Sequence, residues 1–108
     1  MTLAQLATLL EGIPGFIGKV AYRAFPIGEA PDLPYVTFLE RNSENFVADN
    51  SVFYPQTSVD IELYTECKDT VTESLVESAL TDSELVWSKD EDYLDSEDCY
   101  MIVYNITI

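Results

Sequence analysis

Residues 56–80 read QTSVDIELYTECKDTVTESLVESAL, and within this stretch the spacing of apolar residues changes from that of a strand to that of a helix. Val59, Ile61 and Leu63 alternate with polar residues, which predicts a strand with one buried and one solvated face. After a polar break the apolar residues fit one stripe of an α-helix: Val71, Leu75, Val76, Ala79 and Leu80. The stretch therefore predicts a strand that leads directly into a helix.

The start of this helix carries a capping signal. Thr70 and Glu73 have the T-x-x-E spacing of a capping box, in which each side chain bonds a free backbone N–H at the helix start. The helix and the strand each have one apolar face to bury. We therefore expect the helix stripe to pack on the sheet face that Val59, Ile61 and Leu63 form.

The rest of the chain supplies a second helix and further strands. Leu3, Leu6, Ala7, Leu9 and Leu10 share one side of a short N-terminal helix. Thr2 is positioned to cap this helix and Gly12 to end it. We expect strands at residues 19–25, 35–41, 84–89 and 99–108, with a proline-rich extended connector at residues 26–34. In the last strand Ile102, Tyr104, Ile106 and Ile108 share one face, which predicts a buried central or near-central position.

These elements define the expected fold class. We predict a single α+β domain over residues 1–108, with a mostly antiparallel sheet of about five to six strands. An amphipathic helix packs on one face of this sheet, and the short N-terminal helix accompanies it.

Residues 42–55 form the least regular part of the chain, and we interpret them as a long hairpin arm. The arm contains five large apolar residues among polar ones: Phe46, Val47, Val52, Phe53 and Tyr54. Two interpretations stay open. These side chains either close the edge of the core, or they leave the body and bind a neighbouring subunit, since exposed aromatic residues are typical interface anchors.

The charge of the chain limits its partners. Twenty Asp and Glu stand against five Lys and Arg, with no histidine, which gives a formal net charge of −15. DNA, RNA and anionic membranes attract basic surfaces, so we expect neither nucleic-acid nor membrane binding. The lack of histidine removes the commonest general base near neutral pH. No apolar run approaches the ~20 residues of a membrane span, and no leader pattern is present, so we expect a cytoplasmic location.

Candidate chemical sites are weakly supported. Asp90 and Asp92 match the first positions of a calcium loop, but Leu94 stands where a third oxygen ligand belongs, so we interpret residues 90–98 as a solvated acidic turn. Paired carboxylates for glycoside hydrolysis are suggested only by the abundance of acids. Cys67 and Cys99 are expected to be free thiols. We predict no enzymatic activity, no cofactor, no bound metal and no small-molecule substrate.

The chain resembles the tail-terminator and minor tail proteins of long-tailed bacteriophages. The resemblance is carried by AYRAFPIGEAPDLPYVTFLE at residues 21–40, with its proline-rich connector ending in Pro34, Tyr35 and Val36, by VDIELYT at residues 59–65, and by the helix that ends near Leu80. It implies a virion protein without enzymatic activity that forms a ring, commonly hexameric, at the end of the tail tube. The implied partners are copies of itself, the tail-tube protein and a head-completion protein, with DNA only as passing cargo. The implied location is the virion tail, after assembly in the host cytoplasm.

A function from a different class competes with this one. An acidic DNA mimic would inhibit a host nuclease or restriction enzyme by copying the charge of a duplex. The net charge favours this function equally. The placement of charge disfavours it, because eight carboxylates crowd into residues 82–98, whereas a mimic needs charge at regular intervals along one face.

Overall fold

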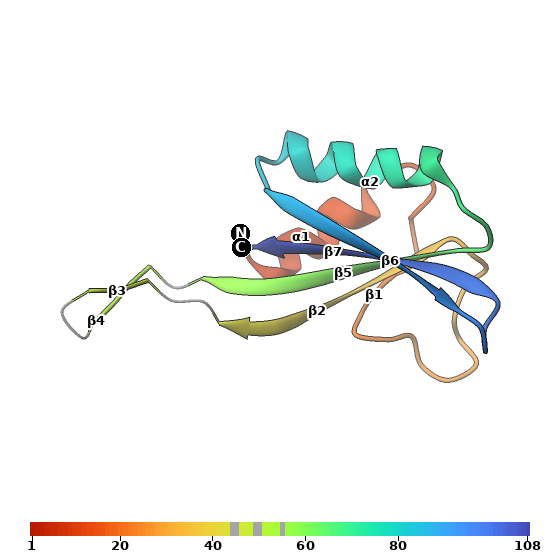
Figure 1. Ribbon diagram of the computed structural model, residues 1–108, viewed down its shortest axis with the longest axis horizontal. Helices are drawn as coiled ribbons and strands as arrows, with labels where there is room; N and C mark the ends of the chain where they lie inside the picture. The colour runs from red at the N-terminus through yellow and green to blue at the C-terminus, as the bar shows by residue number, and fades with distance from the viewer. Residues whose placement is uncertain (44–45, 49–50, 55) are drawn as a thin grey trace.

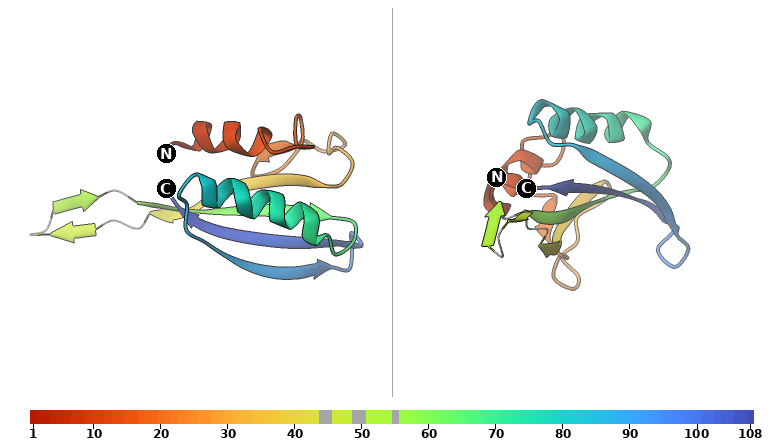
Figure 2. Two further views of the ribbon diagram at one scale, coloured as in Figure 1. Left: turned by 90° about the horizontal axis from the view of Figure 1, so that it is seen from above. Right: turned by 60° about the vertical axis from the view of Figure 1, so that its left-hand side comes forward.

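The computed structural model describes residues 1–43, 46–48, 51–54 and 56–108, and the side chains of residues 1–41 and 56–108. Within these residues the elements follow in this order: α1 (Leu3–Glu11), β1 (Val20–Tyr22), β2 (Tyr35–Ser43), β3 (Phe46–Ala48), β4 (Ser51–Tyr54), β5 (Thr57–Thr65), α2 (Thr70–Asp82), β6 (Trp87–Leu94) and β7 (Cys99–Thr107). Both helices lie on one side of the sheet (Figures 1 and 2). The chain is an α+β protein.

The sheet is mixed, which corrects the prediction of a mostly antiparallel one. In the described residues, five strands are ordered β1-β2-β5-β7-β6. β1 pairs with β2 in parallel, and the other neighbouring strands are antiparallel. A parallel pair needs a connection of about a dozen residues that carries the chain back to the starting end. The proline-rich connector between β1 and β2 makes this return, and local patterns do not reveal it.

The core lies between the helices and the sheet. β5 contributes Val59, Ile61 and Leu63, and β7 contributes Ile102, Tyr104 and Ile106, all at most 1% exposed. Val76 and Leu80 of α2, and Leu6 and Leu10 of α1, belong to the same buried cluster. The central or near-central position predicted for the last strand is confirmed, because β7 lies between the central strand β5 and the edge strand β6.

The inward side of α2 differs from the predicted stripe. Val71 is 72% exposed and Leu75 is 38% exposed, whereas Glu73, Val76 and Leu80 are buried. Residues 73, 76 and 80 recur at helical spacing, so the buried line is rotated away from Val71 and Leu75. The Glu73 carboxylate can be buried at the first position of this line because Lys68 and Lys89 form ion pairs with it.

The predicted capping box at the start of α2 is also wrong. The N-cap is Asp69, whose carboxylate accepts hydrogen bonds from the Thr72 backbone N–H at 3.0 Å and from the Thr72 hydroxyl at 2.6 Å. Glu73 therefore does not reach back to the helix start. At α1 the prediction is confirmed, since Thr2 accepts a bond from the Gln5 N–H and Gly12 is the C-cap.

The strand β6 starts later and runs further than expected. Glu84 adopts φ 61°, and the Leu85 N–H bonds the Leu80 carbonyl, so residues 83–86 complete the turn after α2. The strand then continues through Asp90 and Asp92, where a turn had been predicted. The neighbouring strand β7 supplies the hydrogen-bonding partners that stabilise this acidic segment as a strand.

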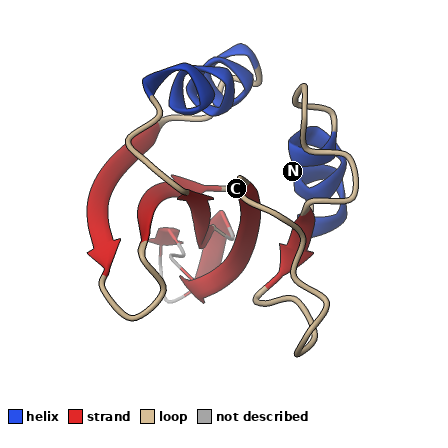
Figure 3. Cartoon of the chain, turned by 90° about the vertical axis from the view of Figure 1, so that its right-hand side faces the viewer, coloured by secondary structure: helices blue, strands red, loops and turns tan. Residues whose placement is uncertain are grey.

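Among the residues that the structure describes, no helix covers the opposite face of the sheet (Figure 3). Strand alternation and register determine which side chains lie on this face. They are Thr37 and Leu39 of β2, Asp60 and Glu62 of β5, Met101, Val103 and Asn105 of β7, and Asp90 and Asp92 of β6. We call this surface the helix-free face. Its side chains are mostly polar, so the same strands present one apolar and one polar surface.

Candidate functional site

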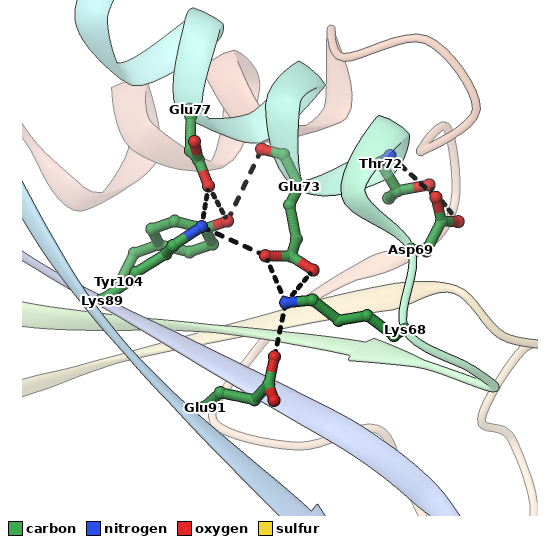
Figure 4. A network of polar contacts seen from close by, with 8 residues as sticks. All are labelled: Lys68, Asp69, Thr72, Glu73, Glu77, Lys89, Glu91 and Tyr104. Atoms are coloured by element: carbon green, nitrogen blue, oxygen red, sulfur yellow. Dashed lines mark hydrogen bonds and ion pairs between the residues drawn. The ribbon is translucent and has the colours of Figure 1, made fainter.

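A cluster of charged side chains lies between α2 and the edge of the sheet (Figure 4). At its centre the Glu73 carboxylate, whose side chain is only 3% exposed, pairs with two lysines. The Lys68 Nζ lies 2.8 Å from Glu73 Oε2, and the Lys89 Nζ lies 3.2 Å from Glu73 Oε1. Lys68 comes from the loop before α2 and Lys89 from β6, so this Glu73 cluster joins three segments of the chain.

Further contacts extend the Glu73 cluster along the helix. Glu77, one helical turn after Glu73, accepts a hydrogen bond from Lys89 at 2.7 Å and one from the Tyr104 hydroxyl at 2.9 Å. Lys68 also donates to Glu91 of β6. The cluster therefore connects α2 to both β6 and β7.

Ion pairing and burial shift four pKa values in this cluster, those of Glu73, Lys68, Lys89 and Tyr104, away from 7. Burial alone would raise the pKa of Glu73, but hydrogen bonds from Lys68 and Lys89 outweigh it and lower the pKa. The bond to Glu73 raises the pKa of Lys68, and the bond to Glu77 raises the pKa of Lys89. Burial, followed by the bond to Glu77, raises the pKa of Tyr104. At neutral pH the Glu73 carboxylate and the two lysines are charged, and the Tyr104 phenol is protonated.

This geometry favours a stabilising role over an acid–base role. A general acid or base works best when its pKa lies near the working pH. Each of the shifts above moves the group further from pH 7. The Glu73 cluster is therefore best explained as a set of ion pairs that fixes α2 over the sheet edge.

Sequence reasoning missed this cluster, although the sequence holds a signal for it. Lys68 and Lys89 are two of only five cations in the chain. Glu73 occupies the same helical line as Val76 and Leu80, which indicates a buried carboxylate in need of a cation. The apolar residues of the helix do not mark this position, because Glu73 is polar.

The five predicted interface residues lie in β3 and β4. These two strands form a separate antiparallel pair, with Phe46 opposite Tyr54 and Val47 opposite Val52. The pair extends beyond the ends of β2 and β5, away from the main sheet (Figures 1 and 2). The side chains of Phe46, Val47, Val52, Phe53 and Tyr54 lie outside the described residues, so neither interpretation of them is tested.

A shallow recess of about 210 Å³ opens on the helix-free face. Its walls include three aromatic rings, with centroids 5.2 Å apart for Phe25 and Tyr35 and 5.0 Å apart for Tyr35 and Tyr64. Burial, followed by the charge of Glu62, raises the pKa of Tyr64 to about 12, so its phenol stays protonated. The recess has room for about one large side chain.

The carboxylates and thiols provide little further chemistry. Among the described residues, no three His, Cys, Asp or Glu side chains are grouped so that they could hold a metal ion. Cys67 is exposed and Cys99 is buried, and both are free thiols. Burial raises the pKa of the Cys99 thiol, which keeps it in the unreactive form.

Comparisons with known proteins do not identify a family. Neither the protein-family models nor the curated proteins gave a match to this chain. In the part of the chain that the structure describes, neither helix has the length and apolar character needed to cross a membrane.

Proposed function

We propose that this chain is a structural subunit of a long-tailed bacteriophage virion. In this proposal it forms a ring at the end of the tail tube, stops tube growth and joins the tail to the head. The role is non-enzymatic, and the partners are copies of the chain, the tail-tube protein and a head-completion protein. The resemblance at residues 21–40 and 59–65 supplies the biological setting of the proposal.

The observation that carries the proposal is the β3–β4 arm. The molecule measures 49 Å along its long axis but only 27 and 23 Å across. In the described residues, β3 and β4 pair with each other and with no strand of the main sheet. At its base, residues 57 and 108 exchange backbone hydrogen bonds of 3.1 and 2.9 Å, which fix the start of β5. A two-stranded hairpin is at best marginally stable by itself, so we infer that a partner stabilises this arm.

The charge of the chain is compatible with DNA passage. The helix-free face carries Asp60 and Glu62 on the central strand β5, away from the two edges of the sheet. Carboxylates of this kind around a ring lumen would repel DNA phosphates, so that a duplex passes without binding. Six copies of a −15 subunit also repel one another at low salt, so we expect closed rings to form on the tube end as a template and the free chain to associate only at high protein concentration.

Electron microscopy of the chain mixed with purified tail tubes from its source phage tests the proposal. We expect rings or capped ends on the tubes and a narrow distribution of tube lengths. Tubes of uncontrolled length without bound density would contradict the proposal. A stoichiometric nuclease recovered from host lysate with the chain would instead support the inhibitor function.

A matched pair of variants tests the arm. Replacing Phe46 and Phe53 by Ser should abolish capping and leave the midpoint of thermal unfolding nearly unchanged. Ile27→Ser is the control, because Ile27 is fully exposed on the connector and should affect neither property. A large fall in the unfolding midpoint of the arm variant would mean that the two rings belong to the core.

A further inference from the structure

The two outer strands of the sheet carry opposite charge. β1 is flanked by Lys19 and Arg23, whereas β6 carries Asp90, Glu91 and Asp92. Arg41, Lys68 and Lys89 form ion pairs, and among the described residues Lys19 and Arg23 form none. The cations without an ion pair therefore gather at one edge of a strongly acidic protein, and a row of carboxylates lies at the other edge.

We propose that β1 of one copy pairs with β6 of the next copy, head to tail, so that the sheet continues from subunit to subunit. Within the described part of the chain each of these strands has a neighbour on one side only. The inference rests on the proposed ring-forming function, and it identifies the two surfaces that join neighbouring subunits.

The directions of the strands suit this arrangement. β1 runs parallel to β2, and three successive antiparallel pairings then lead from β2 to β6. β6 therefore runs opposite to β1. A second copy is placed by a rotation about an axis along the strands, which keeps the strand directions. Its β1 then lies beside β6 of the first copy in antiparallel orientation. Repetition of one such rotation joins unlike surfaces, and it closes into a ring when the rotation is a whole fraction of a full turn.

The charges at the two edges also lie on the same face. Val20 packs against the core, so alternation places Lys19 and Ala21 on the helix-free face, and Arg23 lines the recess on that face. Asp90 and Asp92 lie opposite Val103 and Met101, which also belong to the helix-free face. Opposite charges on neighbouring antiparallel strands attract, so Lys19 and Arg23 of one copy would meet these carboxylates of the next.

The same charges disfavour the symmetric arrangements, in which two β6 edges or two β1 edges pair with each other. Two β6 edges placed together would bring carboxylates against carboxylates, and two β1 edges would bring cations against cations. Lys89 does not reduce the repulsion between two β6 edges, because its ammonium group already pairs with Glu73 and Glu77. Association through these edges is therefore between unlike edges.

The arrangement also sets the direction of the arm. The β3–β4 arm continues the line of β2 and β5 (Figure 1). With the ring axis along the strands, all arms project from the same side of the ring. They are then directed at the component stacked on the ring, which is the tail tube or the head connector, and not at the lateral neighbour.

Disulfide cross-linking tests the pairing. In a Cys67→Ser background, Ala21→Cys and Asp92→Cys place one thiol on each edge of the same chain. Oxidation at high protein concentration should give a ladder of covalent oligomers on a denaturing gel. A matched control combines Ala21→Cys with Asn105→Cys, which lies on the central strand β7, and should give no ladder. The absence of a ladder, or an equal ladder from the control, would overturn the proposal.

Charge reversal in the same background gives an independent measurement. Lys19→Glu with Arg23→Glu should reduce the ladder about tenfold, and Asp90→Lys should also reduce it. Mixing the two reversed proteins should restore cross-links between them, since the acidic β1 edge of one meets the basic β6 edge of the other. Circular dichroism verifies that each variant is folded. Unchanged ladders from both variants would exclude these edges as partners.

The outcomes separate this inference from the proposed function. If the protein caps tail tubes but the edge variants cap them equally well, the edge pairing is wrong and the terminator role stands. If the protein forms the ladder but never binds tubes, the edge pairing stands and the terminator role is wrong.

Discussion

The two faces of the sheet differ in chemistry although the same strands supply both. Along β7, Ile102 and Ile106 are 1% exposed and pack beneath the helices, whereas Asn105 and Thr107 are exposed on the helix-free face. Burial of apolar side chains stabilises a fold, and polar exposed side chains contribute little to it. The helix-covered face therefore carries the stability of the protein, and the helix-free face remains available for association.

The largest expected effect tests whether stability depends on the helix-covered face. Leu80→Ala removes a fully buried side chain of α2 and should reduce the free energy of unfolding by about 3 kcal/mol. Leu75→Ala makes the same chemical change in the same helix at a position that is 38% exposed. We expect it to cost less than about 1 kcal/mol. Urea unfolding measures both changes in the free energy of unfolding. Equal losses would contradict the conclusion that Leu80 lies on the buried line of α2 and Leu75 does not.

An intermediate effect is expected where the helix meets the sheet edge. Glu73→Gln keeps the shape of the side chain but removes the charge that Lys68 and Lys89 neutralise. At neutral pH we expect a loss of about 1–2 kcal/mol in the free energy of unfolding.

The pH dependence of this loss identifies its cause. The pKa of Glu73 is lower in the folded protein than its ordinary value of 4.5. Its ion pairs therefore stabilise the fold above that value, and the contribution disappears as the pH falls through the folded-state pKa. The difference between the wild type and Glu73→Gln should shrink on acidification, whereas the exposed control Glu11→Gln should show little difference at any pH. A difference that stays constant on acidification would mean that packing, and not charge, explains the loss.

The smallest effect is expected on the helix-free face. Arg41 Nε lies 3.0 Å from Asp60 Oδ2, but the Arg41 side chain is 61% exposed. Arg41→Ala should change the free energy of unfolding by less than about 0.5 kcal/mol, and high salt should remove even this difference. Urea unfolding at low and high salt measures it. A loss as large as that of Leu80→Ala would contradict the conclusion that the helix-free face contributes little to stability.

Local patterns predicted most elements of the fold but not their assembly. The alternation in Val59, Ile61 and Leu63, and in Ile102, Tyr104 and Ile106, identified both central strands and their buried sides. Thr2 and Gly12 marked the ends of the first helix. The sequence did not indicate that β1 pairs in parallel, because parallel pairing depends on where the connector carries the chain.

The candidate sites were less predictable than the strands. The arm at residues 42–55 was recognised from its polar residues and aromatics, and the position of β3 and β4 beyond the main sheet came from the structure. The Glu73 cluster was missed because Lys89 and Tyr104 are distant in sequence from Glu73. Lys68, Glu73 and Lys89 become neighbours only when β6 lies beside the helix.

The sequence alone determined the α+β character, the two central strands, the caps of the first helix and the net charge, because these depend on neighbouring residues or on composition. Tertiary structure decided which side of α2 is buried, that Asp69 and not Thr70 caps it, and that residues 90–94 form a strand. It also placed Lys19 and Arg23 at one edge of the sheet and Asp90 and Asp92 at the other. The Asp69 cap is a local contact with Thr72. The other outcomes depend on partners that the fold brings from distant parts of the chain, and no local spacing encodes them.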